Sequence, residues 1–509
     1  MTATATHRRL GARELLELTL DAGTFLSWDR PVRGAAGFPS VPAGYAADLE
    51  AAVEKSGSDE SVLTGEGRIR NHRVAVVVSD FAFLAGSIGR DAAQRLVAAV
   101  ERATELGLPL VAMPASGGTR MQEGTSAFLA MVEIVAAVQA HRTAGLPYLV
   151  YLRHPTTGGV MASWGSLGHV TAAEPGALLG FLGPRVYSAL HGEDFPAGVQ
   201  FAENLFDHGL VDAVVPPEGL GDYFGRVLDL LLARGGYGTV PSRPAPELDS
   251  ADACSADAWD SVLRSRNPLR PSTEELLREA AGNVVLLRGA GDGAKEHGML
   301  VALARFGPNP CVVVGHASGN AMGPASLRDA RRGMRLAGEL GLPLVTVIDT
   351  PGATLSKEAE EGGLAAEIAR CLYDLLGLGT PTLSVLLGQG TGGGALALLP
   401  ADRTIAAQHA WIAPLPPEGA SAIVHRTTSQ APALAESQGI TAAALAGRGV
   451  VDVVVEERPD AALESDAFCR RLREVIAVEL QGLIRAGETR EAGAPGLRTR
   501  RARYRALVS

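Results

Sequence analysis

The chain has 509 residues, of which 46% are hydrophobic and 20% are charged, and its net charge is −10. This length is too great for one hydrophobic core and predicts two or three domains, and the acidic balance excludes the basic surface that nucleic acid requires. No apolar run approaches the roughly 20 residues that span a membrane, and no apolar stretch of a signal peptide follows the first residues.

Cysteine and lysine are scarce, and their positions exclude several kinds of site. No lysine stands in a GK[ST] motif, so we expect no P-loop for ATP. The cysteines are far apart and form no CxxC pair, so we expect neither a metal site nor a disulfide framework, and a reduced, cytoplasmic setting fits best. The residues concerned are Lys55, Lys295, Lys357, Cys254, Cys311, Cys371 and Cys469.

In chain order, helical and strand patterns alternate. Residues 91–105 place apolar side chains at spacings of three and four, which predicts an amphipathic helix. The short apolar run 110–113 predicts a strand that is buried on both faces, and residues 126–143 predict a second helix before another strand. The second half repeats this order with a helix at 327–340, a strand at 344–348 and a helix at 365–376. The alternation predicts an α/β fold.

The two halves also resemble each other in sequence. GLPLVAMPASGGTR from Gly107 resembles GLPLVTVIDTPGAT from Gly341, and GLPYLVYLRHPTTGGVMA from Gly145 resembles GTPTLSVLLGQGTGGGALA from Gly379, each at an offset of 234 residues. GLVDAVVPP and GVVDVVVEE match further on at an offset of 240. Collinear matches predict a duplicated domain. We predict domains at 1–240 and 271–509, joined by a polar, proline-rich linker at 241–270.

Four glycine-containing turns follow the predicted strands and are the candidate site. Glycine lets the backbone approach a ligand closely, and backbone N–H groups at the start of a helix can hold a developing oxyanion without any ionisable side chain. The turns are Ser116-Gly117-Gly118, Gly158-Gly159, Thr350-Pro351-Gly352-Ala353, and Gly390-Thr391-Gly392-Gly393-Gly394.

Two other interpretations of these glycines stay open at this point. Strand ends of any α/β protein carry glycine turns, although their duplication here favours a function. Residues 388–393 also match GxGxxG after a strand, which is typical of a dinucleotide site. That site is disfavoured because Asp402 comes too early for the expected acidic residue, and because the duplicate loop HPTTGGV lacks the pattern.

These motifs resemble a known family. ASGGTRMQEG and GLPYLVYLRHPTTGGVMASWGSLGHVTAAEPGALLGFLGPRV resemble the β subunit of the bacterial acetyl-CoA carboxylase carboxyltransferase. RPSTEELL, VIDTPGA, GQGTGGGALA and PPEGASAIVHR resemble its α subunit. The whole resembles the fused carboxyltransferase (β) chains of actinobacterial acyl-CoA carboxylases. The resemblance implies two tandem crotonase-like domains, each a ββα superhelix.

The resemblance also implies a function and partners. It implies carboxyl transfer from N-carboxybiotin to an acyl-CoA thioester, with acetyl-CoA giving malonyl-CoA for fatty acid biosynthesis. Biotin would be carried by a partner chain, a biotin carboxylase or biotin carboxyl carrier subunit, since no lysine here has a neighbouring methionine. We expect a homodimer or larger oligomer, with each site between copy one of one protomer and copy two of another. Zinc is not expected, since no cysteine precedes Cys254.

The family's site residues carry over by position. Gly158 and Gly159 match the pair that supports the acyl-CoA enolate oxygen. Gly393, Gly394 and Ala395 match the turn that supports the biotin ureido oxygen, although the internal offset pairs Gly158 with Gly392 instead. Two loops resemble those lining the CoA site and one resembles part of the biotin pocket. Their candidate residues are Gly86, Ser87, Gly117, Gly118 and Arg120 on the CoA side, and Thr350, Pro351, Gly352 and Ala353 on the biotin side.

Single polar residues are weighed against plainer roles. Arg120 is equally compatible with a CoA phosphate contact and with a surface ion pair to Glu123. His154 and His169 are interpreted as structural, Glu418 as a helix-start carboxylate, and Asp349 as the cap of the turn that follows it. Met121 and Met131 are expected in the core.

Two rival functions remain. One is a malonyl-thioester or acyl-CoA decarboxylase that uses the same enolate. The other is an inactive scaffold subunit that still binds the carrier protein, and the intact glycine pairs of both halves argue against it.

Overall fold

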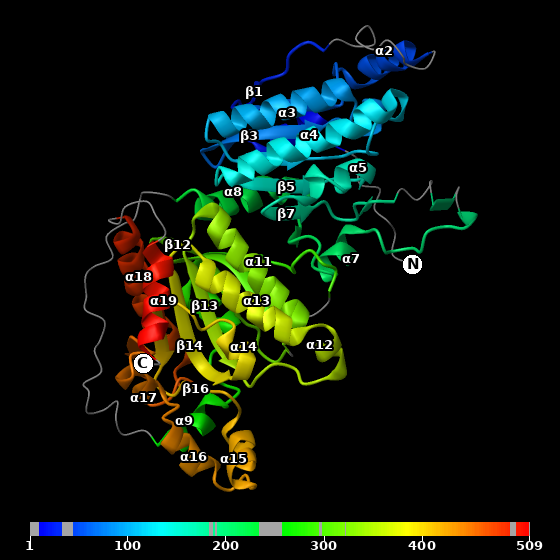
Figure 1. Ribbon diagram of the computed structural model, residues 1–509. Coiled ribbons are helices and arrows are strands. Elements are labelled where there is room, and N and C mark those ends of the chain that lie inside the picture. Colours follow the sequence, from blue (N-terminus) through cyan, green and yellow to red (C-terminus); the bar gives the residue numbers. More distant parts are fainter. Residues whose placement is uncertain are drawn as a thin grey trace. The chain divides into compact units, whose positions relative to one another are not determined.

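The computed structural model describes residues 10–32, 44–182, 187–188, 191–233, 257–294, 298–320, 322–488 and 495–507. The chain divides into two compact units (Figure 1). The first comprises the described residues up to Leu228 together with Gly291–Gly293, and the second comprises the remainder. Each unit is built around its own twisted sheet.

The first unit contains a seven-stranded sheet in the order β1-β2-β3-β4-β5-β7-β9. Its first three strands pair antiparallel and the others pair parallel. Helices α3 and α4 lie side by side across one face (Figure 1). The elements are α1 (Ala12–Thr19), β1 (Leu26–Ser27), α2 (Tyr45–Ser56), β2 (Val62–Ile69), β3 (His72–Ser79), α3 (Arg90–Glu105), β4 (Leu110–Met113), α4 (Gly124–Thr143), β5 (Tyr148–Leu152), β6 (Thr156–Thr157), α5 (Gly158–Met161), β7 (Val170–Ala173), β8 (Leu179–Gly180), α7 (Ala202–Asp207), β9 (Ala213–Val214) and α8 (Leu220–Leu231).

The second unit repeats this plan with the order β10-β11-β12-β13-β14-β15-β17, and β16 pairs with the end of β14. Helices α11 and α13 pack together beside its sheet as α3 and α4 do in the first unit (Figure 1). The elements are α9 (Ala258–Ser265), α10 (Thr273–Ala280), β10 (Gly282–Leu287), β11 (Met299–Phe306), β12 (Asn309–His316), α11 (Pro324–Leu340), β13 (Leu344–Thr350), α12 (Lys357–Glu361), α13 (Leu364–Gly377), β14 (Thr382–Thr391), α14 (Gly392–Leu396), β15 (Arg403–Ala407), β16 (Trp411–Ala413), α15 (Pro417–His425), α16 (Ala431–Gln438), α17 (Ala442–Gly447), β17 (Val453–Val455), α18 (Ser465–Glu488) and α19 (Pro495–Ala506).

The repeated Gly-Leu-Pro has the same structure in both halves. Gly107 and Gly341 adopt left-handed backbone angles, with φ of +64° and +66°, just beyond α3 and α11. The next N–H turns back to the helix, from Leu108 to the Ala103 carbonyl and from Leu342 to the Ala337 carbonyl, both at 2.9 Å. This glycine-dependent helix ending sends the chain directly into the central strand, which explains why the motif precedes β4 and β13.

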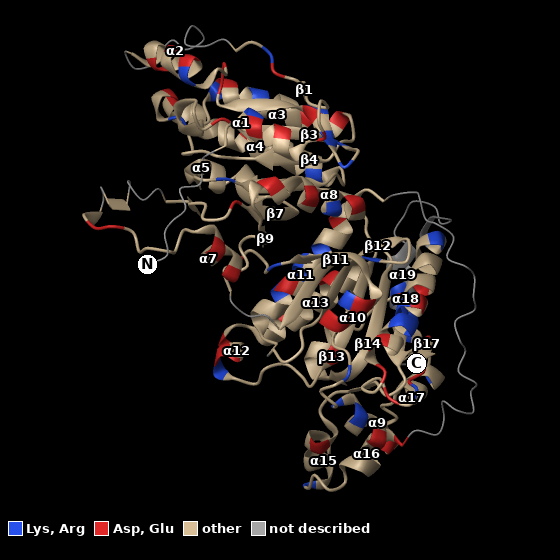
Figure 2. Ribbon diagram, turned by 180° about the vertical axis from the view of Figure 1, so that it is seen from behind, with Lys and Arg blue, Asp and Glu red and all other residues tan. Residues whose placement is uncertain are grey.

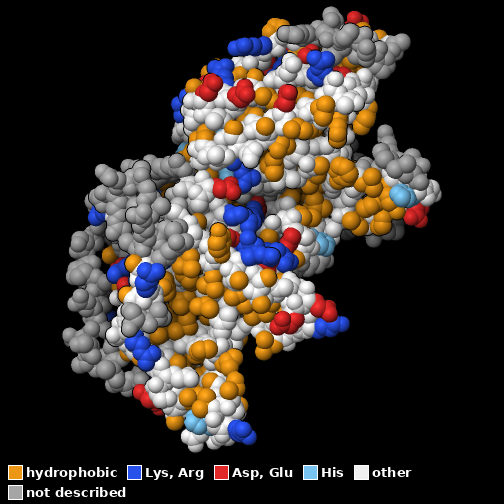
Figure 3. Space-filling view, viewed as in Figure 1, with side chains coloured by type: hydrophobic (Ala, Val, Ile, Leu, Met, Phe, Trp, Pro, Cys, Tyr) orange, Lys and Arg blue, Asp and Glu red, His pale blue; other side chains and the backbone are white. Residues whose placement is uncertain are grey.

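The core lies between each sheet and its helices. Figure 2 shows the central strands mostly without charged residues, while the helices carry both signs. The central strands β4, β5, β12 and β14 are almost wholly buried. Apolar side chains also reach the surface of each unit (Figure 3). Those of α4 are Phe128, Leu129 and Val132, with exposed fractions of 64%, 57% and 67%.

The stretch predicted as a linker is partly structured. Residues 241–256 lie outside the described residues, whereas 257–270 belong to the second unit. Helix α9 begins at the cap Asp257 and buries Val262 against Trp411 and its neighbours. Arg270 is buried and pairs with Glu457 through two hydrogen bonds, at 2.5 and 2.8 Å. A short amphipathic helix inside a proline-rich stretch was therefore missed.

Candidate active site

The glycine pair of the first unit starts α5, directly after β6. Gly158 has a φ of +60°, and its N–H donates to the Phe181 carbonyl at 3.0 Å. Gly159 is the second residue of that helix, where an N–H has no intrahelical acceptor. A Cβ added to Gly159 would come 2.9 Å from Thr119 Oγ1. Gly159, rather than Gly158, is thus the glycine of this pair whose N–H can meet a ligand.

A second turn, at residues 116–118, packs against this glycine pair. The Gly118 N–H donates to Ser116 Oγ at 3.0 Å, and Gly118 adopts a φ of +104°. A Cβ added there would lie 3.1 Å from the Gly159 nitrogen. The two turns therefore contact through bare backbone, and only glycine satisfies both the angle and the distance.

The loop ending at Gly86 and Ser87 packs against the same turn. Gly86 has a φ of +63° and approaches the Ala115 carbonyl so closely that a Cβ would lie 2.0 Å from its oxygen. The Gly117 N–H donates to the Ala85 carbonyl at 3.0 Å. The structure thus brings together in one unit the glycine pair and the loops that sequence analysis assigned to the CoA side.

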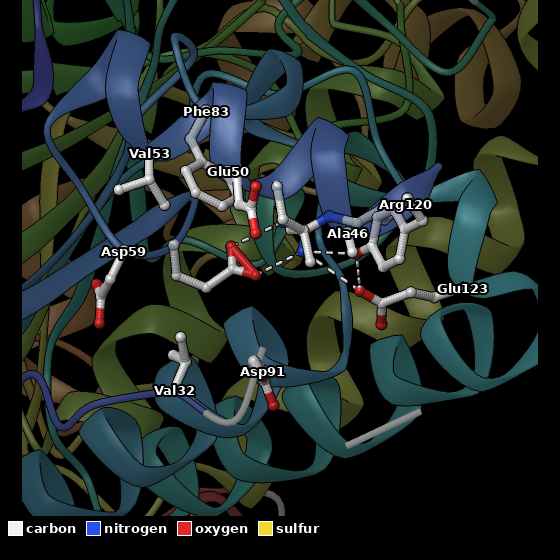
Figure 4. Close-up of a pocket in the computed structure, with 12 residues that line it drawn as sticks. Val32, Ala46, Glu50, Val53, Asp59, Phe83, Asp91, Arg120 and Glu123 are labelled. Carbon is white, nitrogen blue, oxygen red and sulfur yellow. Dashed lines mark hydrogen bonds and ion pairs between the residues drawn. The ribbon is translucent and has the colours of Figure 1, made fainter. Parts of the chain in front are cut away.

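Arg120 is neither a surface residue nor a free phosphate ligand. Its side chain is 1% exposed, and its two terminal nitrogens donate to Glu60 at 2.5 and 2.7 Å (Figure 4). It also donates to the Ser87 carbonyl at 2.8 Å and contacts Glu123 at 3.3 Å. This burial contradicts both the surface position and a direct contact with a CoA phosphate, although the pairing with Glu123 is confirmed. Arg120 fixes the Gly86–Ser87 loop instead of contacting solvent.

A cavity of about 240 Å³ lies behind this ion pair, between α2 and the loops (Figure 4). Tyr45 at its edge donates to Glu123 at 2.5 Å, and burial together with this hydrogen bond raises the pKa of the Tyr45 hydroxyl. Glu50, Asp59 and Asp91 add carboxylates to the lining. Such a lining repels the anionic phosphates of a CoA molecule.

The glycine turn of the second unit has the same design. Gly392 has a φ of +64° and starts α14 directly after β14, as Gly158 starts α5. The structural pairing is therefore Gly158 with Gly392, in agreement with the internal offset. Ala395 is the fourth residue of α14, where the N–H reaches back to the carbonyl of the residue before the helix. The candidate donors are thus the N–H groups of Gly392, Gly393 and Gly394, whereas Ala395 is a buried residue of this helix. Its place in the site stays a prediction.

The turn at residues 350–353 corresponds to the turn at residues 116–118. The Gly352 N–H donates to Thr350 Oγ1 at 3.1 Å with a φ of +128°, as Gly118 does to Ser116. Ala353 follows with its nitrogen 3.6 Å from the position of a Cβ on Gly394. Thr350, Pro351, Gly352 and Ala353 thus border α14, and their role in a biotin pocket stays a prediction.

The remaining polar residues mostly have structural partners. His154 Nδ1 accepts from the Leu178 N–H and His169 Nδ1 from the Tyr148 N–H, both at 3.0 Å. Glu418, in the first turn of α15, pairs with Arg266 at 2.6 Å. These interpretations are confirmed.

Two further expectations need correction. Met131 is buried, with 7% of its surface exposed, but Met121 is 81% exposed because it precedes α4 and faces solvent. Asp349 does not cap its own turn, which Thr350 does. Its Oδ1 instead accepts the Gln389 N–H from β14 at 2.9 Å.

The GxGxxG match does not form a dinucleotide site. Gly388 and Gly390 lie inside strand β14, and Gly390 pairs with Ile412 of β16. The helix that follows has only five residues. The Asp402 carboxylate accepts hydrogen bonds from Thr382 and Arg500. It therefore has a structural role and is not the ribose-binding carboxylate of a dinucleotide site. Within the described residues, no cluster of three or more His, Cys, Asp or Glu side chains could hold a metal ion.

Sequence reasoning missed the residues that hold the turns in place. Glu60 and Tyr45 lie far from Arg120 in sequence, and no spacing rule connects them. Glu174 and Asp349 both place a carboxylate beside a glycine turn. Asp349 alone was singled out from the sequence, as a cap, because it stands next to the turn at residues 350–353.

Comparison with known proteins now adds to this geometry. Residues 8–215 match the family described as "Carboxyl transferase domain", and residues 253–507 match "Acetyl co-enzyme A carboxylase carboxyltransferase-like". Over 505 residues the chain is 54% identical to the "Probable biotin-dependent acyl-coenzyme A carboxylase beta3 subunit" of Mycobacterium tuberculosis, covering 98% of this chain and 99% of the relative.

The chain belongs to the carboxyltransferase subunits of biotin-dependent acyl-CoA carboxylases. It is accordingly a carboxyltransferase. It is also 39% identical over 501 residues to the "Acetyl-coenzyme A carboxylase carboxyl transferase subunits beta/alpha" of Salinispora arenicola, covering 94% of this chain and 88% of the relative. The family resemblance stated from the motifs is confirmed.

Solved structures confirm the fold. The chain aligns with transcarboxylase 12S at a TM-score of 0.73, covering 96% of this chain and 92% of the other at 21% identity. It aligns with a single-chain, multi-domain long-chain acyl-CoA carboxylase at a TM-score of 0.68, covering 91% of this chain and 46% of the other. The predicted α/β class with two tandem crotonase-like domains is therefore confirmed.

Proposed function

We propose that this chain transfers the carboxyl group of N-carboxybiotin, carried on a partner protein, to the α-carbon of acetyl-CoA. The product is malonyl-CoA for fatty acid biosynthesis. The observation that carries the proposal is the pair of matching glycine turns, at Gly158 and Gly392, in a chain that belongs to the carboxyltransferases. Each turn follows a central strand, and each presents first-turn N–H groups.

The first turn suits the acyl-CoA. Removing a proton from the carbon beside a thioester places negative charge on the thioester oxygen, and the Gly159 N–H is positioned to hold that charge. The α-carbon then bonds to the carboxyl carbon as the bond between that carbon and the ureido nitrogen of biotin breaks. Within this chain, Gly118 and Gly86 keep the supporting backbone close enough to fix the Gly159 N–H in place.

The second turn suits the ureido oxygen of biotin. Carboxybiotin supplies the carboxyl group and takes up the α-proton, so the chain needs no general base of its own. Gly392, Gly393 and Gly394 offer consecutive N–H groups, and Gly394 packs so tightly that a Cβ would lie 2.1 Å from Met322 Cε. The turn at residues 350–353 borders these donors. Neutral donors of this kind suit an oxygen that gains partial negative charge.

Free biotin and malonyl-CoA test the function with the purified chain alone. We expect carboxybiotin and acetyl-CoA in equal amounts. A decarboxylase would instead release acetyl-CoA and CO₂ whether or not biotin is present, and an inactive scaffold would produce neither. Either of the last two results would replace the proposed function.

Acetyl-CoA is proposed over longer acyl groups because Ala397, two residues beyond Ala395 of the second glycine turn, is a small apolar residue, as in the acetyl-CoA carboxylase subunits that the chain resembles. Ala397 is buried, and its N–H donates to the Gly393 carbonyl at 2.9 Å. One methylene in an apolar pocket changes binding by about 1–3 kcal/mol, so the preference is expected to be about tenfold. Comparison of kcat/KM for acetyl-, propionyl- and long-chain acyl-CoA in the reconstituted complex measures it. A tenfold advantage of a longer substrate would overturn the acetyl assignment and leave carboxyl transfer intact.

We further propose a cytoplasmic homodimer or larger oligomer that works with a biotin carboxylase and carrier subunit, and whose sites form between halves of different protomers. Residues 121–143 form a helix long and apolar enough, by length and composition alone, to cross a membrane. Its inner face packs in the core of the first unit through Met131 and Ile134. The exposed Phe128, Leu129 and Val132 support a subunit contact for the outer face, because monomeric proteins rarely expose a large contiguous apolar patch.

A further inference from the structure

Both glycine turns follow a segment in which the chain that leads to the turn advances two residues further than its neighbour. In the second unit, Ile348 of β13 pairs with Leu386 of β14, and the next pair joins Thr350 to Gly390. Strand β14 therefore advances two residues further than β13 between these two pairs. In the first unit Ala112 pairs with Val150, and the next bridge joins Ser116 to Thr156. The same two extra residues appear there. Strand β14 thus carries a bulge before its glycine turn, and the connection between β5 and β6 carries the equivalent two residues before the other.

A bulge leaves backbone N–H and C=O groups without a hydrogen-bond partner in the neighbouring strand. Here a carboxylate oxygen accepts one such N–H in each unit. The Gln389 N–H donates to Asp349 Oδ1 at 2.9 Å. In the first unit the His154 N–H donates to Glu174 Oε2 at 2.8 Å. The internal offset matches His154 to the residue just before Gln389, so the two carboxylates hold neighbouring positions of the equivalent segments. They come from different elements, Asp349 from β13 and Glu174 from the segment after β7.

The Asp349 carboxyl packs directly against the bulge in β14. A Cβ added to Gly388 would lie 2.4 Å from its Oδ1. Before the bulge one edge of β14 pairs with β15, and beyond it the same edge pairs with β16, where Gly390 lies opposite Ile412. Gly392 follows two residues later. The position of the second glycine turn therefore depends on how the bulge is fixed.

We propose that Asp349 and Glu174 are positioning residues for the two glycine turns, Asp349 on the biotin side and Glu174 on the acyl-CoA side. This inference rests on the proposed function. A hydrogen bond to an ionised acceptor is roughly twice as strong as a neutral one, so a carboxylate holds a bulge more firmly than a neutral acceptor would. Oxyanion donors contribute only when they are held in place before the reaction.

Crossed kinetics of two alanine variants test the inference with free biotin and malonyl-CoA. Asp349→Ala is expected to lower kcat/KM for free biotin by about tenfold or more, a modest fraction of the 10²–10³ typical of losing an oxyanion donor, with KM for malonyl-CoA within about twofold. Glu174→Ala is expected to raise KM for malonyl-CoA and to leave KM for biotin within the same range. Asp349→Asn and Glu174→Gln keep an acceptor oxygen and are expected to restore most of the loss.

Controls separate positioning from general damage. Asp207→Ala removes an exposed carboxylate at the end of α7 and is expected to behave as the wild type. If an alanine variant does not fold, the corresponding amide variant is measured in its place. Any loss in Asp349→Asn should then affect biotin kinetics only, and any loss in Glu174→Gln should affect malonyl-CoA kinetics only. Equal effects on both substrates, or no effect in folded variants, would overturn the inference. A wild-type chain without any transfer would overturn the proposed function instead.

Discussion

Replacing Gly159 by valine should abolish carboxyl transfer while the first unit stays folded. The new side chain would meet Thr119 Oγ1 at 2.9 Å or closer and would cover the one glycine N–H of the pair that remains available. Losing one oxyanion donor costs about 10²–10³ in kcat. The transfer assay with free biotin measures the loss, and circular dichroism reports folding. Gly219→Val is the matched control, because a Cβ there meets only ordinary contacts at 3.6 Å or more. Full activity in folded Gly159→Val would refute the donor assignment.

The pH dependence of stability should change when Asp349 becomes asparagine. Burial raises the pKa of the Asp349 carboxyl from 3.8 to about 6, although the Gln389 N–H and Arg270 partly oppose this. The folded protein therefore retains a proton between about pH 4 and pH 6 that the unfolded chain releases, so stability falls as the pH rises through this window. Burial lowers the pKa of the neighbouring His316 to about 4, which keeps that ring neutral over most of the window.

Asp349→Asn removes this titration. The stability of the variant relative to the wild type should therefore increase from pH 4 to pH 7, by no more than about 3 kcal/mol. Denaturant unfolding of both proteins at several pH values measures the difference. A difference that stays constant across this range would show that the carboxyl does not titrate there.

At this scale the repeat predicted the glycine turns well, because a positive φ and a close backbone contact demand glycine in both copies. Gly118 and Gly352 show this, with φ of +104° and +128°. The partners of Arg120 could not be predicted, because Glu60 lies 60 residues away in sequence and contacts it only through the folded chain. Likewise, nothing local distinguishes the exposed Met121 from the buried Met131 until the start of α4 is known.

At the scale of elements, the ion pair between Arg120 and Glu60 joins the loops of the first unit. Arg120→Met should destabilise this unit by about 3–5 kcal/mol, because it leaves the Glu60 carboxylate buried without its partner. Adding Glu60→Leu should recover part of the loss, since one of the two buried carboxylates that pair with Arg120 is then removed. Arg73→Met, which breaks the more exposed pair with Glu66, is the control and should cost less than about 1 kcal/mol. Denaturant unfolding compares the three variants with the wild type, and equal losses for Arg120→Met and Arg73→Met would contradict this expectation.

The periodicity of apolar residues predicted the elements themselves closely. Strand β4 has the predicted bounds, and α3, α4, α11 and α13 differ by a few residues at one or both ends. Helix α9 was missed because eight residues beside a proline-rich stretch give too short a pattern. The bulge in β14 and the two extra residues between β5 and β6 were also missed, because a register shift of two residues leaves the alternation of side chains unchanged.

At the scale of the whole molecule, the purified chain should be at least a homodimer. Each unit carries one of the two glycine turns, and a two-fold pairing of copies would complete two sites at once. Phe128, Leu129 and Val132 on α4 supply an exposed apolar face for such a contact. Phe128→Arg should therefore shift sedimentation toward the monomer and reduce transfer in parallel, because a charge in an apolar interface is costly to bury. Leu106→Arg, at another exposed apolar position of the same unit, should leave both unchanged. An active monomer would contradict the expectation, whereas a hexamer would agree with it, since a hexamer can be built from such dimers.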